Sequence, residues 1–140
     1  MDQLTASATS DFNLNSPTRF INRELSWLDF NFRVVSEAEN ARHPLLERLR
    51  FVSISASNLD EFYSVRVAGL IAQARAGILE RSPDGLTASQ QLSAINTRSH
   101  QLIGAQQAAF RNLRDLLASA GIVICTSAQL TSDDAQFLDS

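Results

Sequence analysis

The apolar residues of this chain recur mainly at intervals of three and four, the spacing of one face of an α-helix. Between residues 22 and 41 this stripe is formed by Leu25, Leu28, Phe32 and Val35. Asn22 stands where an N-cap is expected, and Glu24 would suit the positive end of the helix dipole. A chain patterned in this way must bury one face of each helix, so the sequence predicts an all-α fold.

Three further helices are expected. One covers residues 44–56, and a second begins at Ser57 and buries Phe62 and Val65. After the turn sequence SPDG at residues 82–85, Thr87 and Gln90 form a capping box that should open a long helix. The predicted buried side of this helix consists of Leu92, Ile95, Leu102, Ala109, Leu113 and Leu116, and Gly121 should end it. Four helices joined by short turns predict a small antiparallel bundle.

The two ends of the chain differ from this core. Residues 1–18 are rich in Ser, Thr, Asn and Asp and are expected to be a disordered tail. Residues 122–125, IVIC, are predicted to form a strand that buries Cys125, and another helix should start at Thr131. Because that helix has only about two turns, residues 121–140 are interpreted as the truncated start of a following domain, after a bundle at 19–120.

Composition narrows the function classes. The net charge of −3 does not favour nucleic-acid binding. The single cysteine excludes an internal disulfide and a multi-cysteine zinc site. No apolar run approaches the roughly 18 residues of a transmembrane helix, and the start of the chain lacks a secretory signal. We therefore expect a cytoplasmic protein, with peripheral membrane attachment left open. All twelve basic residues are arginine, which indicates either phosphate contacts or genomic codon bias.

Few side chains suggest catalysis. His43 and His100 are far apart in the sequence and are expected to have surface or capping roles. The five glycines are isolated and form no phosphate-binding loop, and no metal-ligand cluster is evident. The sequence therefore predicts no catalytic residue and no metal site.

The stretch SNLDEF, residues 57–62, is the remaining candidate. Ser57 and Asp60 match the first and last positions of a helix-capping box, so a helix start would explain both. Asn58 is not explained in this way. An amide carries donors and an acceptor, which suit the edge of a nucleobase.

Three ordered motifs carry a resemblance to a known family: RFINRELSWLDFNFRVVSEAEN, PLLERLRFVSI and SNLDEFYSVRVAGL. Together they resemble the amino-terminal region of polyphosphate kinases of the long, histidine-phosphorylated type. The match runs almost continuously from Arg19 to Leu70 and continues more loosely to the end of the chain. Of the aromatic-rich stretch that often follows SNLDEF in this family, Phe62 and Tyr63 are retained.

The resemblance implies an enzyme that reversibly transfers the terminal phosphate of ATP to inorganic polyphosphate. It implies a phosphohistidine and magnesium (Mg²⁺) in carboxyl-terminal domains outside this chain, and neither His43 nor His100 matches the phosphorylated position. The amino-terminal domain would be a helical bundle that forms one wall of the nucleotide site, with Asn58 on the ATP base. The implied partners are ATP or ADP, polyphosphate, the remaining domains and a second copy of the enzyme. The chain alone is expected to be inactive.

Two other functions remain open at this stage. The chain could be a helical docking or assembly module without a ligand of its own. Alternatively, Arg48, Arg50 and Arg66 could form a polyphosphate-binding surface, although salt bridges such as Glu47 with Arg50 would also account for these charges.

Overall fold

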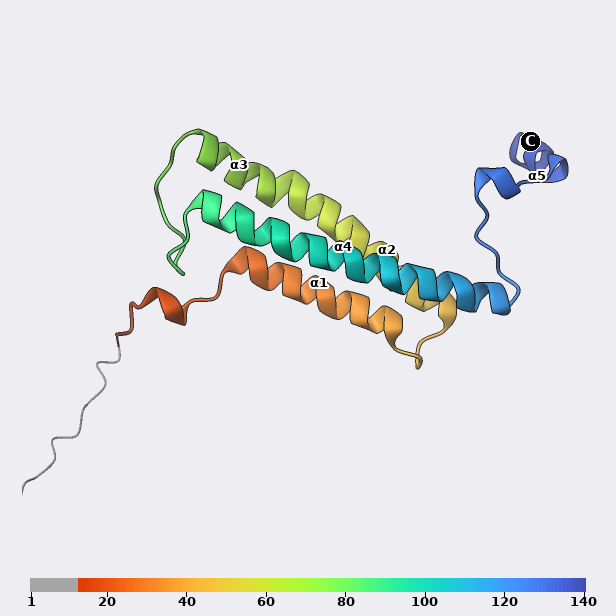
Figure 1. Cartoon of the computed structure of the whole chain (residues 1–140), viewed down its shortest axis with the longest axis horizontal. Coiled ribbons are helices and arrows are strands. Elements are labelled where there is room, and N and C mark those ends of the chain that lie inside the picture. Colours follow the sequence, from red (N-terminus) through yellow and green to blue (C-terminus); the bar gives the residue numbers. More distant parts are fainter. Residues whose placement is uncertain (1–12) are drawn as a thin grey trace, which may run out of the picture.

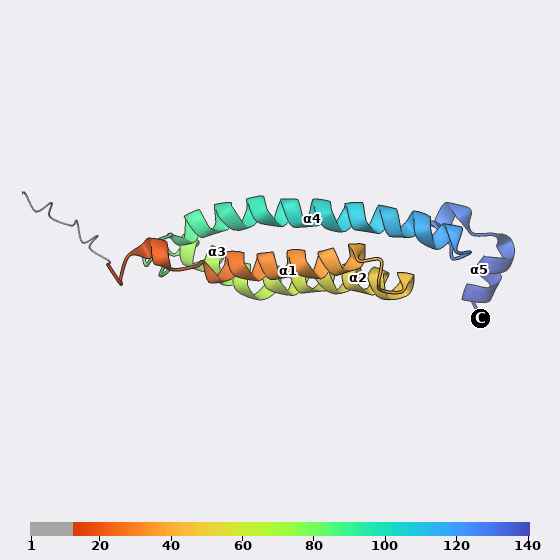
Figure 2. The same cartoon turned by 90° about the horizontal axis from the view of Figure 1, so that it is seen from below.

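A computed structural model of the chain describes residues 13–140, and the first part of the expected tail lies outside the described residues. The predicted all-α bundle is confirmed, because the described residues form helices and no strand. Three long helical rods lie side by side: α1, a rod formed by α2 and α3, and α4 (Figures 1 and 2). The α1 and α4 rods run in the same direction, and the α2–α3 rod runs opposite to both (Figure 1). The bounds are α1 Arg23–Glu39, α2 Leu45–Phe62, α3 Ala68–Arg75 and α4 Ala88–Ser119.

Helix α1 begins as predicted. The side-chain oxygen of Asn22 accepts hydrogen bonds from the backbone N–H groups of Glu24 and Leu25, at 3.0 and 3.1 Å. The Asn22 amide also donates to Asp84 and Gln91. These two bonds attach the start of α1 to the loop before α4 and to α4 itself, so one capping residue joins three segments.

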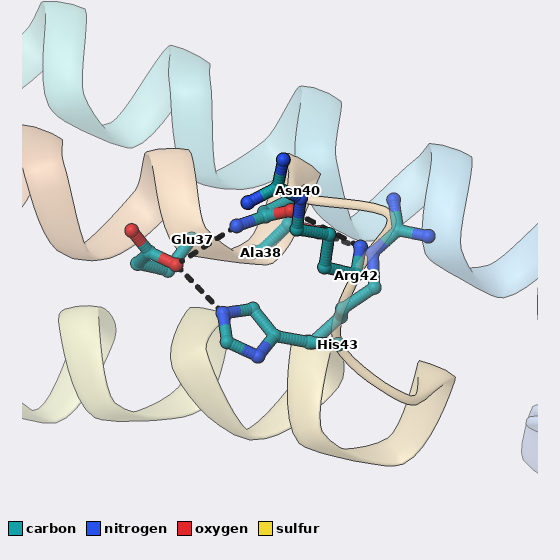
Figure 3. A network of polar contacts seen from close by, with 6 residues as sticks. Glu37, Ala38, Asn40, Arg42 and His43 are labelled. Atoms are coloured by element: carbon teal, nitrogen blue, oxygen red, sulfur yellow. Dashed lines mark hydrogen bonds and ion pairs between the residues drawn. The ribbon is translucent and has the colours of Figure 1, made fainter.

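The corner between α1 and α2 is closed by polar contacts (Figure 3). Oε2 of Glu37 accepts a hydrogen bond from the Asn40 amide and lies 2.7 Å from Nε2 of His43. These hydrogen bonds, that of His43 above all, lower the pKa of the Glu37 carboxyl below its ordinary value of 4.5. The buried Arg48, on the first turn of α2, donates from Nε to the backbone carbonyl of Ala38 near the end of α1, at 2.7 Å.

SNLDEF does not start a helix, and this prediction is wrong. Residues 57–62 form the last six positions of α2. Ser57 lies within this helix, not at its start, and is exposed. The buried face of α2 runs through the motif without interruption, at Val52, Ser55, Leu59 and Phe62. A helix break at Ser57 would take Leu59 and Phe62 out of register with α1 and α4, which explains why packing prevails over the capping pattern.

A π-helical turn, η2 (Tyr63–Val67), joins α2 to α3 and makes them one rod. A π turn inserts one extra residue into the helical repeat. The next buried residue after Phe62 is therefore Val67, five positions later, and the predicted core residue Val65 is 66% exposed. The extra residue turns Val65 outward from the bundle.

The α4 helix has both expected ends. Thr87 and Gln90 form the capping box, and Gly121, with φ of 85°, ends the helix. The backbone N–H groups of Gly121 and Ile122 donate to the carbonyls of Ala118 and Leu117, the pattern of a Schellman motif. Its buried apolar residues are Ala88, Ile95, Leu102, Ala109, Leu113 and Leu117, whereas the predicted core residue Leu116 is 38% exposed.

The segment after α4 differs from the prediction. Residues 122–125 are not a strand, and Cys125 is exposed rather than buried. A strand needs a partner edge, and the described part of the chain offers none. The helix expected at Thr131 is confirmed as α5 (Ser132–Leu138), with Thr131 as its N-cap. Every residue from 121 to 140 is exposed, and α5 lies beyond the end of the three rods (Figures 1 and 2).

Before α1, residues 17–19 form the short 3-10 helix η1 (Pro17–Arg19). Pro17 and Thr18, which fall within the expected tail, are therefore helical. Across residues 13–140, none of the helices combines the length and the hydropathy of a membrane-spanning segment.

Candidate functional site

A pocket with a volume of about 420 Å³ opens between α1 and the α2–η2 part of the neighbouring rod. We call it the Asn58 pocket. It is lined by Trp27, Phe30, Asn58, Glu61, Phe62, Val65 and Arg66. Aromatic and aliphatic groups therefore lie beside one amide and two charges of opposite sign.

Helical spacing brings these residues to one place. Glu61 and Phe62 follow Asn58 by three and four positions, so these three residues are neighbours on the surface of α2. Val65 lies in the π turn, is 66% exposed and lines the same pocket. On α1, Trp27 and Phe30 are three positions apart and therefore also lie on one side of their helix, where they form the aromatic wall of the pocket.

Asn58 is half-buried at this pocket. Its Nδ2 donates a hydrogen bond to Oδ1 of Asn31 on α1, at 3.3 Å. Of the other polar residues in the SNLDEF motif, Glu61 lines the pocket, whereas Ser57 and Asp60 are exposed outside its lining. The motif thus directs one amide and one carboxylate to the pocket.

The aromatic wall is held rigidly. The rings of Trp27 and Phe62 stack with centroids 4.5 Å apart and an interplanar angle of 6°. Phe62 is buried and also meets Tyr63 edge to face, at 6.0 Å. Because Phe62 is buried and stacks on Trp27, the indole ring of Trp27 is backed by the core.

The arginines proposed as a polyphosphate surface have other partners. Arg48 is buried against Ala38, so its guanidinium is not part of an open surface. Arg66 donates to Glu24 at 3.1 Å, and Arg50 lies 3.8 Å from Glu47, the pair expected from the sequence. Such contacts neutralise these charges in part and account for them without a bound polyanion.

The two histidines lie away from the Asn58 pocket. His43 is at the α1–α2 corner beside Glu37, and Nδ1 of His100 lies 2.7 Å from the carbonyl oxygen of Asn96 on α4. Among residues 13–140, no three His, Cys, Asp or Glu side chains are grouped so that they could hold a metal ion.

Sequence reasoning missed Asn31 and the pocket-lining role of Trp27. Asn31 lies on the buried stripe of α1, between Leu28 and Val35, and is fully buried. A polar residue on an otherwise apolar stripe was the available signal. The role of Trp27 depends on the partner rod, which periodicity within α1 does not reveal.

Comparison with known proteins places the chain in a family. Residues 20–125 match the family model described as the polyphosphate kinase N-terminal domain. A polyphosphate kinase of Erythrobacter litoralis is 50% identical over 129 residues, which cover 89% of this chain and 18% of that protein. A polyphosphate kinase of Halalkalibacterium halodurans is 46% identical over 132 residues, or 93% of this chain and 19% of that protein.

A third relative, the polyphosphate kinase of Mycolicibacterium gilvum, is 51% identical over 119 residues, or 84% of this chain and 16% of that protein. The chain thus spans about a fifth of the length of the curated relatives it matches. No solved structure was found to match it. The family model covers most of the chain, including α1, the α2–α3 rod and α4, and the chain belongs to the polyphosphate kinase N-terminal domain family.

Proposed function

We propose that this chain is the nucleotide-facing, amino-terminal domain of an enzyme that reversibly transfers the terminal phosphate of ATP to inorganic polyphosphate. Family membership and the names of the relatives support the reaction class. ATP or ADP and polyphosphate would be the substrates. The complete enzyme would be a cytoplasmic homo-oligomer.

The observation that carries the nucleotide role is the position of Asn58 in the pocket. A nucleobase has flat apolar faces and polar edges, and binding sites for such ligands combine apolar walls with a few placed polar groups. Trp27, Phe30 and Val65 supply the walls, and the amide of Asn58 supplies the polar group. In this proposal Asn58 binds the base, and the phosphates extend away from the bundle.

The chemical step would take place on other parts of the enzyme. Phosphoryl transfer needs a nucleophile, a metal ion and cationic groups that converge on the phosphate. His43 and His100 contact Glu37 and the Asn96 carbonyl, which supports the surface or capping roles expected of them. The phosphohistidine and the magnesium ion are therefore proposed to lie outside this chain.

We also propose that residues 121–140 begin a further domain that follows a bundle at 19–120. The apolar side chains of Val123, Phe137 and Leu138 are more than half exposed. Such side chains are normally covered in a folded protein, and the rest of the enzyme would supply the cover.

The test is an Asn58→Ala substitution in the full-length enzyme, with the exposed Asn112 on α4, replaced by Ala, as the matched control. Loss of the hydrogen bonds to the base should raise the KM for ATP by about tenfold. The KM for polyphosphate and kcat should change little, and the control should behave as the unaltered enzyme. An unchanged KM for ATP in the Asn58→Ala enzyme would reject the nucleotide role.

The alternative function is docking or assembly without a ligand. Leu46 and Ile54 on α2 are large apolar side chains at the surface, and they favour contact with another protein segment. In that case the Asn58 substitution would leave the KM for ATP unaltered, and Leu46→Ser would weaken assembly.

A further inference from the structure

We propose that Asn31 is a positioning residue that fixes the amide of Asn58 in the orientation that selects adenine over guanine. This inference rests on the proposed nucleotide role of Asn58. It concerns a residue on another helix, whose side chain is buried and does not line the pocket.

The hydrogen bond between the two amides provides the mechanism. Nδ2 of Asn58 donates to Oδ1 of Asn31, whose side chain on α1 is fully buried. An asparagine amide without such a partner can rotate and present either its oxygen or its nitrogen to a ligand. The bond to Asn31 restricts this rotation, because it holds the nitrogen end of the Asn58 amide toward the core.

The fixed orientation has a consequence for base recognition. With Nδ2 held toward Asn31, Oδ1 of Asn58 is left as an acceptor, and the second N–H of the amide remains a donor. Adenine offers its N6 amino group as a donor beside a ring-nitrogen acceptor, which matches this pair. Guanine has the acceptor O6 at the position of the N6 amino group, so O6 would face the acceptor Oδ1 of Asn58. The arrangement therefore favours a 6-aminopurine.

The chemistry of the core supports a role beyond packing. Nδ2 of Asn31 is buried and has no hydrogen-bond partner among the described residues. A buried donor without a partner destabilises a protein, and an apolar side chain at this position would avoid that penalty. Ser99 is buried and unpaired as well, but only Asn31 bonds to a residue that lines the pocket, and this contact supports the positioning role.

The experiment compares Asn31→Leu, Asn58→Ala and the double variant in the full-length enzyme. Leu has a similar size and removes the acceptor. Asn31→Ser, whose side chain is too short to hold the Asn58 amide, is a second replacement that keeps a polar group in case Leu does not fold. Ser99→Ala is the matched control, because Ser99 is also buried and its Oγ also lacks a hydrogen-bond partner in the described part of the chain. The readouts are kcat, the KM for ATP and the inhibition constant of GTP as a competitor.

The expected result for both Asn31 variants is a rise of roughly five- to tenfold in the KM for ATP, with a similar loss of preference for ATP over GTP. The kcat should change little, and Ser99→Ala should change neither constant. In the Asn58→Ala background, Asn31→Leu should have no further effect, since the two residues act as a unit.

The outcomes separate the two proposals. If Asn58→Ala weakens ATP binding but both Asn31 variants retain the affinity and the preference for ATP, the positioning role is overturned and the nucleotide role stands. Additive effects of Asn31→Leu and Asn58→Ala would also overturn it, because they would show that Asn31 acts through packing. If Asn58→Ala leaves ATP binding unchanged, the proposed nucleotide role is rejected, and the positioning role that rests on it is rejected as well.

Discussion

Replacement of Arg48 tests the packing of the α1–α2 corner. The Arg48 side chain is 7% exposed, and its Nε donates to the Ala38 carbonyl, one of the carbonyls left without an intrahelical partner at the end of α1. Arg48→Met keeps the apolar stem in the core but removes the donor and the positive charge. A hydrogen bond from a charged group contributes about 1.5–3 kcal/mol, and a cation at a helix C-terminus adds about 0.3–1 kcal/mol.

The free energy of unfolding should therefore fall by about 2–4 kcal/mol in Arg48→Met. Equilibrium unfolding in urea measures this value, and the midpoint should fall by about 1 M or more with an unchanged slope. Arg50→Met is the matched control, because the Arg50 side chain is 71% exposed and lies 3.8 Å from Glu47. It should cost no more than about 0.5 kcal/mol. Equal effects of the two substitutions, or a loss below about 0.5 kcal/mol for Arg48→Met, would refute the reasoning.

Three further predictions concern acid stability, the core and activity. The lowered pKa of Glu37 stabilises the fold above its ordinary value of 4.5, and this contribution is lost as the pH falls through the lower folded-state pKa. Urea unfolding should show that Glu37→Gln destabilises the chain at neutral pH and that the difference shrinks in acid; a difference independent of pH would contradict this. Leu102→Ala should cost about 2–5 kcal/mol, because Leu102 is fully buried, whereas Ile103→Ala, at a partly exposed neighbour, should cost less than about 1 kcal/mol by the same assay. The purified chain should form no acid-insoluble polyphosphate from labelled ATP. Labelled polymer in an amount that increases with the concentration of the chain would contradict this prediction.

The helices were predictable because their cause is local. Asn22, Thr87 and Gly121 are capping signals that depend on a few neighbouring residues, and each acts where the sequence placed it. The capping pattern at Ser57 and Asp60 failed because the same residues fit the middle of a helix. At these positions tertiary packing determines the structure, because a continuous helix keeps Leu59 and Phe62 in the core.

The π turn could not be predicted from a 3.6-residue period, because it changes the period itself. With this turn, Val67 is the buried residue after Phe62 and the predicted core residue Val65 is exposed. The expected strand at residues 122–125 and the burial of Cys125 failed for a different reason. Both require a partner surface, and the described residues provide none.

The candidate site was predictable only in part. Asn58 stood out because a helix start did not explain it, and its pocket position is compatible with the role that the family resemblance implies. Asn31 was not predicted, since its contact with Asn58 is a hydrogen bond between residues 27 positions apart. Contacts of this kind arise from the packing of α1 against α2, and one helix's sequence does not encode them.

Photoaffinity labelling tests the central claim most directly. The full-length enzyme would be labelled with an ATP analogue that carries an azide on the base, with and without excess ATP, and then digested with trypsin. All basic residues of this chain are arginine, so cleavage separates residues 24–33, which contain Trp27 and Phe30, from residues 51–66, which contain Asn58. The account predicts ATP-protected label on one or both of these peptides. Protected label confined to peptides outside residues 13–140 would contradict it.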